Sequence, residues 1–488
     1  MAQPSVIRSL RHRVVEFFAF EPGEARPTLL LTLYLLLAMA SVIALKAISN
    51  SLFLKRFDAK GLPFVYVAIA ATAGFVVSFY IRLAARLPQN RLLIYTQAFF
   101  AVNLVAFWGL LRLRLDWLPA IMYVWTGVYA VIITSQVWTL ANHIFTTRQA
   151  RRLFSTVGTG GILGAALGGQ LSGVMVRAFG TENLLLTGVG FLAACAAIVT
   201  YLWRTSRGAA APGPTKSKQP APTSMAESLA AIGSSRHLLL ITVLVVLSAV
   251  VNCLVDYQFK FIVRRQYGSD SDAMTAFFAS FAGYLAVFGL AMQILLTSRL
   301  LRKFGLNFAV FVLPFSMFLG SSVLLFSAGL VGAILIKGFD GAFRHSIDRS
   351  STELLYVPLP SRLKQQAKSF IDMVATRAAD ALAGLLLLLL VPVLHFSVQQ
   401  ISWVNIVIIV PWLAVAFLLG REYINALRAS IERKDISAEA LLIEMASTSA
   451  GEEISTALSS SDERAVEAGL GLLQYGYSGA AHANLASM

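Results

Sequence analysis

The chain has 488 residues, of which 57% are hydrophobic and only 13% are charged, and its mean hydropathy is +0.71. Soluble domains carry about a quarter charged residues, so this composition excludes an ordinary soluble protein. The net charge of +15 is carried by short loops between apolar runs, which indicates membrane topology and not nucleic-acid binding. Both cysteines, Cys195 and Cys253, lie in apolar runs, so no disulfide framework, cysteine metal site or cofactor is expected. The composition predicts an all-α polytopic protein of the lipid bilayer.

Residues 1–26 place Val6, Leu10 and Phe17 at helical spacing with arginines between them. This pattern predicts an amphipathic helix on the cytoplasmic membrane surface, and a solvated tail is the alternative. The stretch contains no uninterrupted apolar core of the kind found in a secretory signal. The first span is therefore expected to act as the insertion signal.

Six apolar runs follow, each long enough to cross a hydrocarbon layer of about 30 Å. They lie near residues 27–49, 62–82, 91–111, 117–141, 155–177 and 183–203. Residues 204–236 are then rich in Gly, Ala, Pro, Ser, Lys and Gln, which predicts a flexible linker. Six more runs lie near residues 237–260, 273–298, 306–327, 329–347, 367–394 and 400–420. The chain therefore predicts two bundles of six transmembrane helices, at 27–203 and 237–425, joined by the linker.

The distribution of Lys and Arg predicts the orientation of this chain. With the N-terminus inside, the loops assigned to the cytoplasm carry most of these residues, so both termini and the linker are expected to be cytoplasmic. In a bacterium the membrane would be the inner one. Residues 426–488 alternate like short amphipathic helices and resemble a fragment of a HEAT-type array. This soluble tail is a candidate binding site for a cytoplasmic protein partner.

A basic turn followed by a glycine-rich helix lies between Trp138 and Gly173. Arginines 148, 151 and 152 form the turn, which cannot enter hydrocarbon. Beyond it Gly160, Gly164 and Gly168 recur every fourth residue, so one helix face has almost no side-chain bulk and another helix can approach closely. The alternative is a phosphate-cradling loop, but such a loop needs a lysine and a hydroxyl after its last glycine. Gly169 is followed by glutamine and leucine instead.

The two predicted bundles resemble each other in sequence. The segment RLAARLPQNRLL after the second span corresponds to SRLLRKFGLNFAV after the eighth. The segment QARRLFSTVGTGGILGAALGG likewise corresponds to QQAKSFIDMVATRAADALAGL. The second pair sets Arg152 opposite Lys368 and Gly164 opposite Asp380, and it sets Gly161 opposite an arginine. Parallel repeats of this kind predict a central cavity that opens alternately to each side of the membrane.

Ionisable side chains inside the predicted spans are the candidate functional residues, because burying a charge in hydrocarbon is costly. Spacings of three and four place Asp256 and Lys260 on one helix face, with Asn252 one turn earlier. The tenth span has a similar stripe of four charges, and the eleventh has one of three. For the lysines, snorkelling or a structural ion pair is the alternative to a substrate role. The candidate substrate-binding residues are Lys46, Asp256, Lys260, Lys337, Asp340, Arg344, Arg377 and Asp380, and the remaining charges of the two stripes are Asp348 and Asp372.

Three segments resemble the nucleotide ATP/ADP translocases of plastids and intracellular bacteria. They are RHSIDRSSTELLYVPLPSRLKQQAKSFIDMVATR, then AN followed by ARRLFSTVGTGG, and the pair Asp256 and Lys260. The resemblance covers residues 27–420 and implies a major-facilitator-like fold of twelve helices that exchanges nucleotides. Three positions depart from the family pattern. The region ALKAISNS keeps only Lys46 as a cation, His143 follows the AN pair where an acid is expected, and Asp380 stands where a lysine is expected. An acid at that position weakens the attraction of a polyphosphate.

These patterns leave two classes of function open. The first is a secondary transporter for an anionic, nucleotide-like or phosphorylated metabolite that works by alternating access, with Arg344 and Arg377 binding the substrate and the acids balancing them. The second is a membrane scaffold or sensor that keeps the fold and signals through its cytoplasmic tail. An intramembrane enzyme is not expected, because the sequence contains no HExxH motif, no paired catalytic histidines and no nucleophile elbow.

Overall fold

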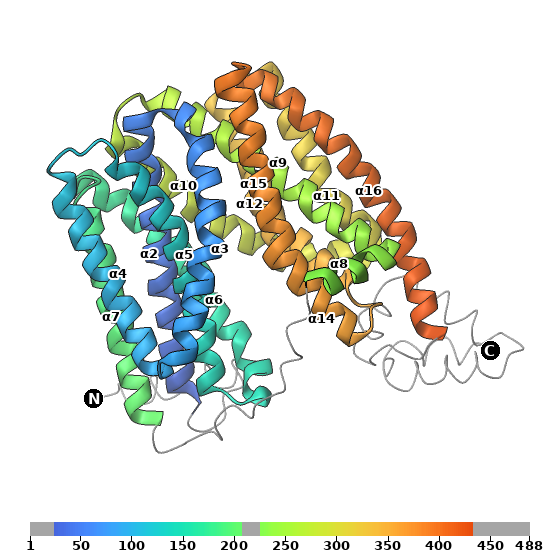
Figure 1. Cartoon of the computed structure of the whole chain (residues 1–488), viewed down its shortest axis with the longest axis horizontal. Helices are drawn as coiled ribbons and strands as arrows, with labels where there is room; N and C mark the ends of the chain where they lie inside the picture. Colours follow the sequence, from blue (N-terminus) through green and yellow to red (C-terminus); the bar gives the residue numbers. More distant parts are fainter. Residues whose placement is uncertain (1–23, 207–224, 433–488) are drawn as a thin grey trace, which may run out of the picture. The chain divides into compact units, whose positions relative to one another are not determined.

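The computed structural model describes residues 24–206 and 225–432 (Figure 1). The amphipathic segment expected before residue 24, most of the predicted linker and the tail beyond residue 432 lie outside these ranges. Every regular element of the described residues is helical. Met225–Ser234 forms helix α8, so the last third of the segment that composition assigns to the linker is helical.

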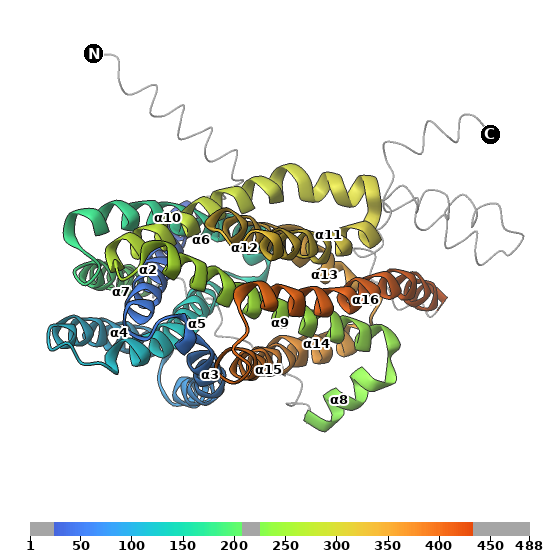
Figure 2. The ribbon, with the colours of Figure 1, turned by 90° about the horizontal axis from the view of Figure 1, so that it is seen from above.

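The helices before the linker are long and lie side by side, as the views of Figures 1 and 2 show. Helix α2 packs against α5, α6 and α7, and α4 packs against α7. Side chains of α2 such as Leu31, Tyr34 and Leu45 are fully buried, so α2 forms the centre of this bundle. The bounds are α2 Ala25–Phe57, η1 Ala59–Gly61, α3 Leu62–Arg86, α4 Gln89–Leu111, α5 Leu118–Ile144, α6 Thr147–Phe179 and α7 Leu184–Ser206.

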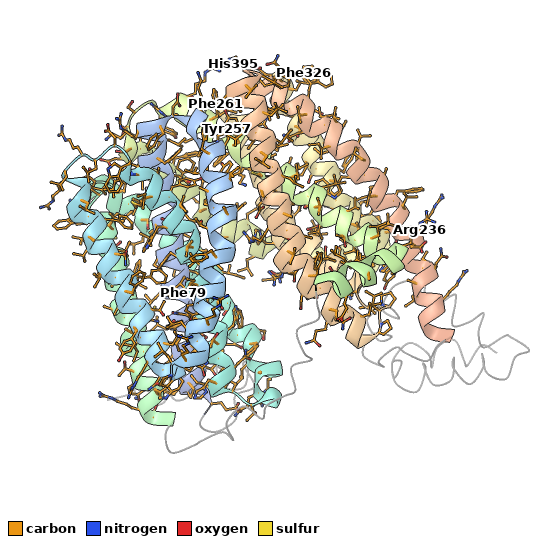
Figure 3. All side chains as sticks on the ribbon, viewed as in Figure 1. Phe79, Arg236, Tyr257, Phe261, Phe326 and His395 are labelled. Atoms are coloured by element: carbon orange, nitrogen blue, oxygen red, sulfur yellow. The ribbon has the colours of Figure 1, made fainter. Side chains whose placement is uncertain are left out.

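The helices after the linker are interrupted more often. Helix α11 packs against α12 and α16, and Trp412 of α16 is fully buried in the core of these helices. Figure 3 shows Arg236, at the start of α9, and Phe326, at the end of α11, at opposite ends of this group. The bounds are α8 Met225–Ser234, α9 Arg236–Tyr267, α10 Ser271–Met292, η2 Gln293–Thr297, α11 Ser298–Phe326, α12 Leu330–Phe343, η3 Arg344–Asp348, α13 Arg349–Leu355, α14 Ser361–Phe370, η4 Ile371–Ala375, α15 Thr376–Leu388, η5 Leu389–Val393 and α16 Val398–Glu432.

The chain divides into two compact units, and the division does not follow the linker. Unit 1 comprises residues 1–219 and Lys260–Val287, and unit 2 comprises residues 220–259 and 288–488. The end of α9 and most of α10 therefore belong to unit 1. Arg264 lies 3.6 Å from Asp58, and Asp272 accepts hydrogen bonds from the backbone and the hydroxyl of Thr181 at 2.8 and 2.6 Å. These contacts attach the α9–α10 hairpin to α2 and α6.

Ten helical stretches of the described chain are long and apolar enough to cross a membrane. One of them, Ser271–Phe326, covers both runs predicted at 273–298 and 306–327, and it contains a break at Gly305, where φ is 75°. The run predicted at 329–347 is helical, but its charges keep it outside the ten. The all-α polytopic fold is thus confirmed, and the count of twelve spans remains a prediction.

Glycines let α6 approach two partners closely in unit 1. A Cβ atom on Gly160 would overlap the carbonyl oxygen of Thr32, and one on Gly164 would overlap that of Leu36, so no side chain separates α6 from α2. On another face, a Cβ atom on Gly169 would lie only 2.5 Å from the carbonyl oxygen of Ala279 in α10. Gly168 and Gly173 make equally close approaches to α2 and α10. The four-residue glycine spacing is therefore a packing device on two sides of one helix.

Four π-helical segments interrupt the helices of the described part of unit 2: η2, η3, η4 and η5. A π-turn contains one residue more than an α-turn, so it rotates the residues on either side relative to one another, and such turns are frequent at functional sites. Segment η3 begins at Arg344, and η4 ends two residues before Arg377. Both predicted stripes of charge are thus interrupted by a change of helical register.

Candidate functional site

A network of ionised side chains joins α9 to the α12–η3 helix inside unit 2. Asp340 is its centre, because one carboxylate oxygen lies 2.6 Å from a guanidinium nitrogen of Arg344 and the other lies 3.2 Å from Nζ of Lys337. Lys337 also lies 3.3 Å from a carboxylate oxygen of Asp256. Asp340 is only 2% exposed, so a single buried acid is shared by two bases from its own helix.

Two uncharged residues of α9 complete this network. Ser248 accepts a hydrogen bond of 2.7 Å at its hydroxyl from Nη1 of Arg344, and Asn252 accepts one of 3.3 Å at its side-chain oxygen from Lys337. Ser248, Asn252 and Asp256 are four residues apart, so they line one face of α9. We call the set Ser248, Asn252, Asp256, Lys337, Asp340 and Arg344 the charge network.

Lys260 makes a different set of contacts, within unit 1. Its ammonium group donates a hydrogen bond of 2.7 Å to the hydroxyl of Tyr123 and one of 3.4 Å to that of Tyr66. The same nitrogen lies 5.3 Å from the centres of both tyrosine rings, within the range of cation–π attraction. Lys260 is only 7% exposed, so two aromatic residues of α3 and α5 hold a buried cation.

Arg377 and Asp380 form an ion pair of 3.1 Å within the first turns of α15. Their side chains are 46% and 33% exposed, so this pair is far more accessible than Asp340. Asp380 is also close enough to Arg344 for an electrostatic interaction, as is Asp348. Lys46 lies in α2 of unit 1 with an exposed side chain. Of the eight predicted substrate-binding residues, the structure brings four into the charge network and two into the Arg377–Asp380 pair.

Sequence reasoning missed Ser248, Tyr66 and Tyr123. The four-residue spacing from Ser248 to Asp256 was available as a signal, since it continues the polar face of α9 by one turn. No local signal marks the tyrosines, because Tyr66 and Tyr123 reach Lys260 from segments more than 130 residues away in sequence. A second buried polar group was also missed: Gln258 of α9 donates to Ser402 and accepts from Asn405 of α16 at 2.8 Å each.

The charge network combines ionised groups of both signs. Two acids and two bases balance one another, and the arginine presents a planar fork that forms two parallel hydrogen bonds with a carboxylate or a phosphate. Ionised groups inside an apolar bundle are costly and mark substrate or ion pathways. Among the described residues no group of histidines, cysteines and acids is arranged to hold a metal ion. The arrangement is thus suited to recognising a charged solute by ion pairing.

The fold is that of a secondary transporter of the major-facilitator type. The chain is similar to the crystal structure of the nucleoside transporter NupG, with a TM-score of 0.59 at 12% identity over 81% of this chain and 99% of that one. It is also similar to the peptide transporter POT in complex with sulfate, with a TM-score of 0.57 at 14% identity over 83% and 95% of the two chains.

Residues 101–343 and 327–423 match the TLC ATP/ADP transporter family, and the chain belongs to this family. The ADP,ATP carrier protein 1 of Chlamydia trachomatis is 24% identical over 392 residues, which are 72% of this chain and 74% of that protein. The ADP,ATP carrier protein 3 of Rickettsia felis is 21% identical over 415 residues, which are 75% and 82% of the two chains. The protein is therefore a multi-pass membrane transporter, and the comparisons favour transport over the scaffold alternative. Its relatives are named as carriers, which fits the expectation that this chain is not an enzyme.

Proposed function

We propose that this protein is a secondary transporter that exchanges an anionic, nucleotide-related metabolite across the membrane by alternating access. The observation that carries the proposal is the charge network, in which Lys337 and Arg344 are held inside an apolar bundle by acids that a substrate can replace. The names of the relatives, ADP,ATP carrier proteins, support a nucleotide or a similar phosphorylated compound.

In this mechanism the acids form ion pairs with the lysine and arginine side chains while no substrate is bound. An entering phosphate or carboxylate group competes with Asp340 for Arg344 and with Asp380 for Arg377, because an arginine pairs with either kind of anion through two hydrogen bonds. Asp380 lowers the positive potential at its position, where the family pattern expects a lysine. The site with Asp380 thus favours an anion of lower charge than a site with a lysine at that position would favour.

The decisive experiment is uptake by liposomes containing the purified protein and preloaded with unlabelled solute. ATP, ADP, AMP and non-nucleotide phosphorylated metabolites would be compared as labelled substrates, with the corresponding nucleosides as uncharged controls. We expect uptake of a phosphorylated compound to require a counter-substrate inside and to fall at least tenfold in Arg344→Gln. Arg349→Gln, which changes an exposed arginine five residues later, should transport normally. Uptake of nucleosides alone, or full uptake by Arg344→Gln, would contradict the proposal.

We further propose that both termini face the cytoplasm and that a bacterial host carries the protein in its inner membrane. The excess of lysine and arginine in the loops assigned to the inside supports this orientation. A reporter fused after residue 488 that is active only in the cytoplasm tests it. Activity of a periplasm-specific reporter at the same position would show the opposite orientation.

A further inference from the structure

An apolar cavity of about 940 Å³ lies within unit 1 between α3, α4 and α5. This volume lies at the upper end of the range of about 300–1,000 Å³ found for ligand pockets. Its walls include Ala68, Thr72 and Phe79 of α3, Tyr95 of α4, and Ile121 and Val128 of α5. Apolar atoms form almost all of the lining, so the cavity suits hydrocarbon and not the charged substrate proposed above.

The cavity is long and runs with the helices. On α3 its lining extends from Phe64 to Leu87, at the turn into α4. At 1.5 Å per residue, the stretch from Phe64 to Leu83 alone covers about 28 Å, which is close to the thickness of about 30 Å of bilayer hydrocarbon. The cavity therefore follows the direction of a lipid acyl chain and ends beside the turn between α3 and α4.

Three arginines lie next in sequence to the residues that line that end of the cavity. Arg82 and Arg86 lie three and seven residues after Phe79, so they continue the helix face on which Phe79 lines the cavity. Arg91 precedes Leu92, which lines the cavity from the start of α4. All three side chains are exposed, and none forms an ion pair with another residue of the described chain.

The arginines alone are explained by membrane topology, since basic residues collect on the cytoplasmic side. The cavity beside them adds a second feature, because it places a space for hydrocarbon next to positive charge that no acid of the described residues neutralises. Basic groups beside gaps between helices at the cytoplasmic surface bind anionic lipid head groups. We propose that this cavity is a binding site for an anionic phospholipid, with its acyl chains between α3, α4 and α5 and its phosphate held by Arg82, Arg86 and Arg91.

The related segment of unit 2 provides a matched control. The sequence RLAARLPQNRLL has its counterpart in SRLLRKFGLNFAV, where Arg299, Arg302 and Lys303 are likewise exposed. A triple substitution there removes the same amount of charge from an equivalent surface. It therefore separates binding at the cavity from general attraction between a basic protein and an anionic membrane.

The test is native mass spectrometry of the full-length protein titrated with phosphatidylglycerol and with phosphatidylcholine of the same acyl chains. We expect the wild type to retain one phosphatidylglycerol in preference to phosphatidylcholine. The triple variant Arg82→Gln, Arg86→Gln, Arg91→Gln should lose this preference by about tenfold or more. The triple variant at Arg299, Arg302 and Lys303 should keep it. Equal losses in both triple variants, or equal retention of the two lipids by the wild type, would overturn the assignment.

The acyl-chain part of the proposal is tested separately by filling the cavity. Ala68→Phe places an aromatic ring among the lining residues of α3, whereas Ala71→Phe places the same ring on an exposed position of that helix outside the lining. We expect the first variant to release the bound lipid and the second to retain it. If Ala68→Phe does not fold, Thr72→Leu supplies a smaller obstruction at another lining residue. Retention of the lipid in every folded cavity variant would show that the chains bind elsewhere.

Discussion

The two repeats use one equivalent position for opposite purposes. In α6 of unit 1, Gly164 has no side chain and lies against the backbone of Leu36 in α2. Its counterpart in α15 of unit 2 is Asp380, which carries a charge and pairs with Arg377. The first repeat thus uses the position to bring two helices together, and the second uses it to present an ionised group. The difference shows that equivalent positions of two related bundles can serve close helix packing in one and an ion pair in the other.

A second pair of equivalent positions is alike. Arg152 of α6 lies 2.5 Å from Glu24, and Lys368 of α14 lies 2.5 Å from Glu353. Each repeat therefore uses a basic residue before its fifth span to hold a glutamate. The surroundings differ, because the side chain of Glu24 is only 7% exposed and that of Glu353 is 48% exposed. The same contact should consequently contribute more to stability in unit 1.

The largest loss of stability is expected for Asp340→Ala, which removes the central acid of the charge network in unit 2. Removal of the shared acid leaves Lys337 and Arg344 without their buried partner, and breaking a buried ion pair costs about 3 to 5 kcal/mol. Thermal unfolding of the protein in detergent measures the loss, with Glu182→Gln as the exposed control. The double variant Asp340→Ala, Arg344→Ala should recover part of the stability. A loss in the double variant equal to the sum of the two single losses would show that these charges do not interact.

A smaller loss of stability is expected for Gly164→Leu, which tests the close packing of α6 on α2 in unit 1. The new side chain must displace the backbone of α2, and overpacking of this kind costs about 1 to 3 kcal/mol or more. Gly158→Leu is the matched control, because a Cβ atom on Gly158 in the same helix meets nothing within 4 Å. We expect expression and melting temperature to fall for Gly164→Leu alone. Unchanged stability of this variant would disprove close packing of α6 on α2.

The comparison of the two glutamate contacts is sharpened by Arg152→Gln and Lys368→Gln. The first change leaves the buried carboxylate of Glu24 with Gln149, which donates to it at 2.9 Å, so a loss of about 1 to 2 kcal/mol is expected. The second change removes an exposed pair worth about 0 to 1 kcal/mol. Melting temperatures in the same detergent give the order. A larger loss for Lys368→Gln would show that burial does not decide the strength of these contacts.

The smallest stability effect is expected at Arg377 and Asp380. If this pair were fully buried, losing one partner would be expected to cost about 3 to 5 kcal/mol. The structure shows side chains that are 46% and 33% exposed, so that expectation is too large and a coupling of about 1 kcal/mol or less applies. Unfolding of Arg377→Ala, Asp380→Ala and the double variant measures this coupling. Uptake by liposomes should still fall in Arg377→Ala, and wild-type uptake by all three variants would remove the pair from the mechanism.

The sequence predicted the fold well, because its signals are local. Runs of apolar residues, the repeat and the glycine spacing depend only on neighbouring residues and on the bilayer, which leaves helices as the main solution for this composition. The predicted stripes of charge were also useful, and the structure joins Lys337, Asp340 and Arg344 as their spacing suggests. No signal in the sequence indicated the π-helical segment η3, which begins at Arg344 and ends at Asp348.

Partners that come from other helices could not be predicted. The spacing places Asp256 and Lys260 on one face of α9, but it gives no indication that Asp256 lies beside Lys337 or that Lys260 donates to Tyr123. The separation of 137 residues between Lys260 and Tyr123 carries no periodic signal. The choice depends on how helices meet in three dimensions, and one sequence does not contain that information.

The assignment of the α9–α10 hairpin to unit 1 bears on how the protein can be divided. Duplication of an ancestral half would place the genetic boundary in the linker, yet Thr181 and Gly169 of the first half are completed by Asp272 and Ala279 of the second. A fragment ending at residue 219 would therefore lack α10, the helix that packs on Gly169, and this face of α6 would be exposed. Each product of a gene split in the linker would need the other chain during biogenesis. A split after Val287 would keep unit 1 on one chain, but it would cut α10 and leave residues 220–259 of unit 2 on that chain, so neither position separates the two units.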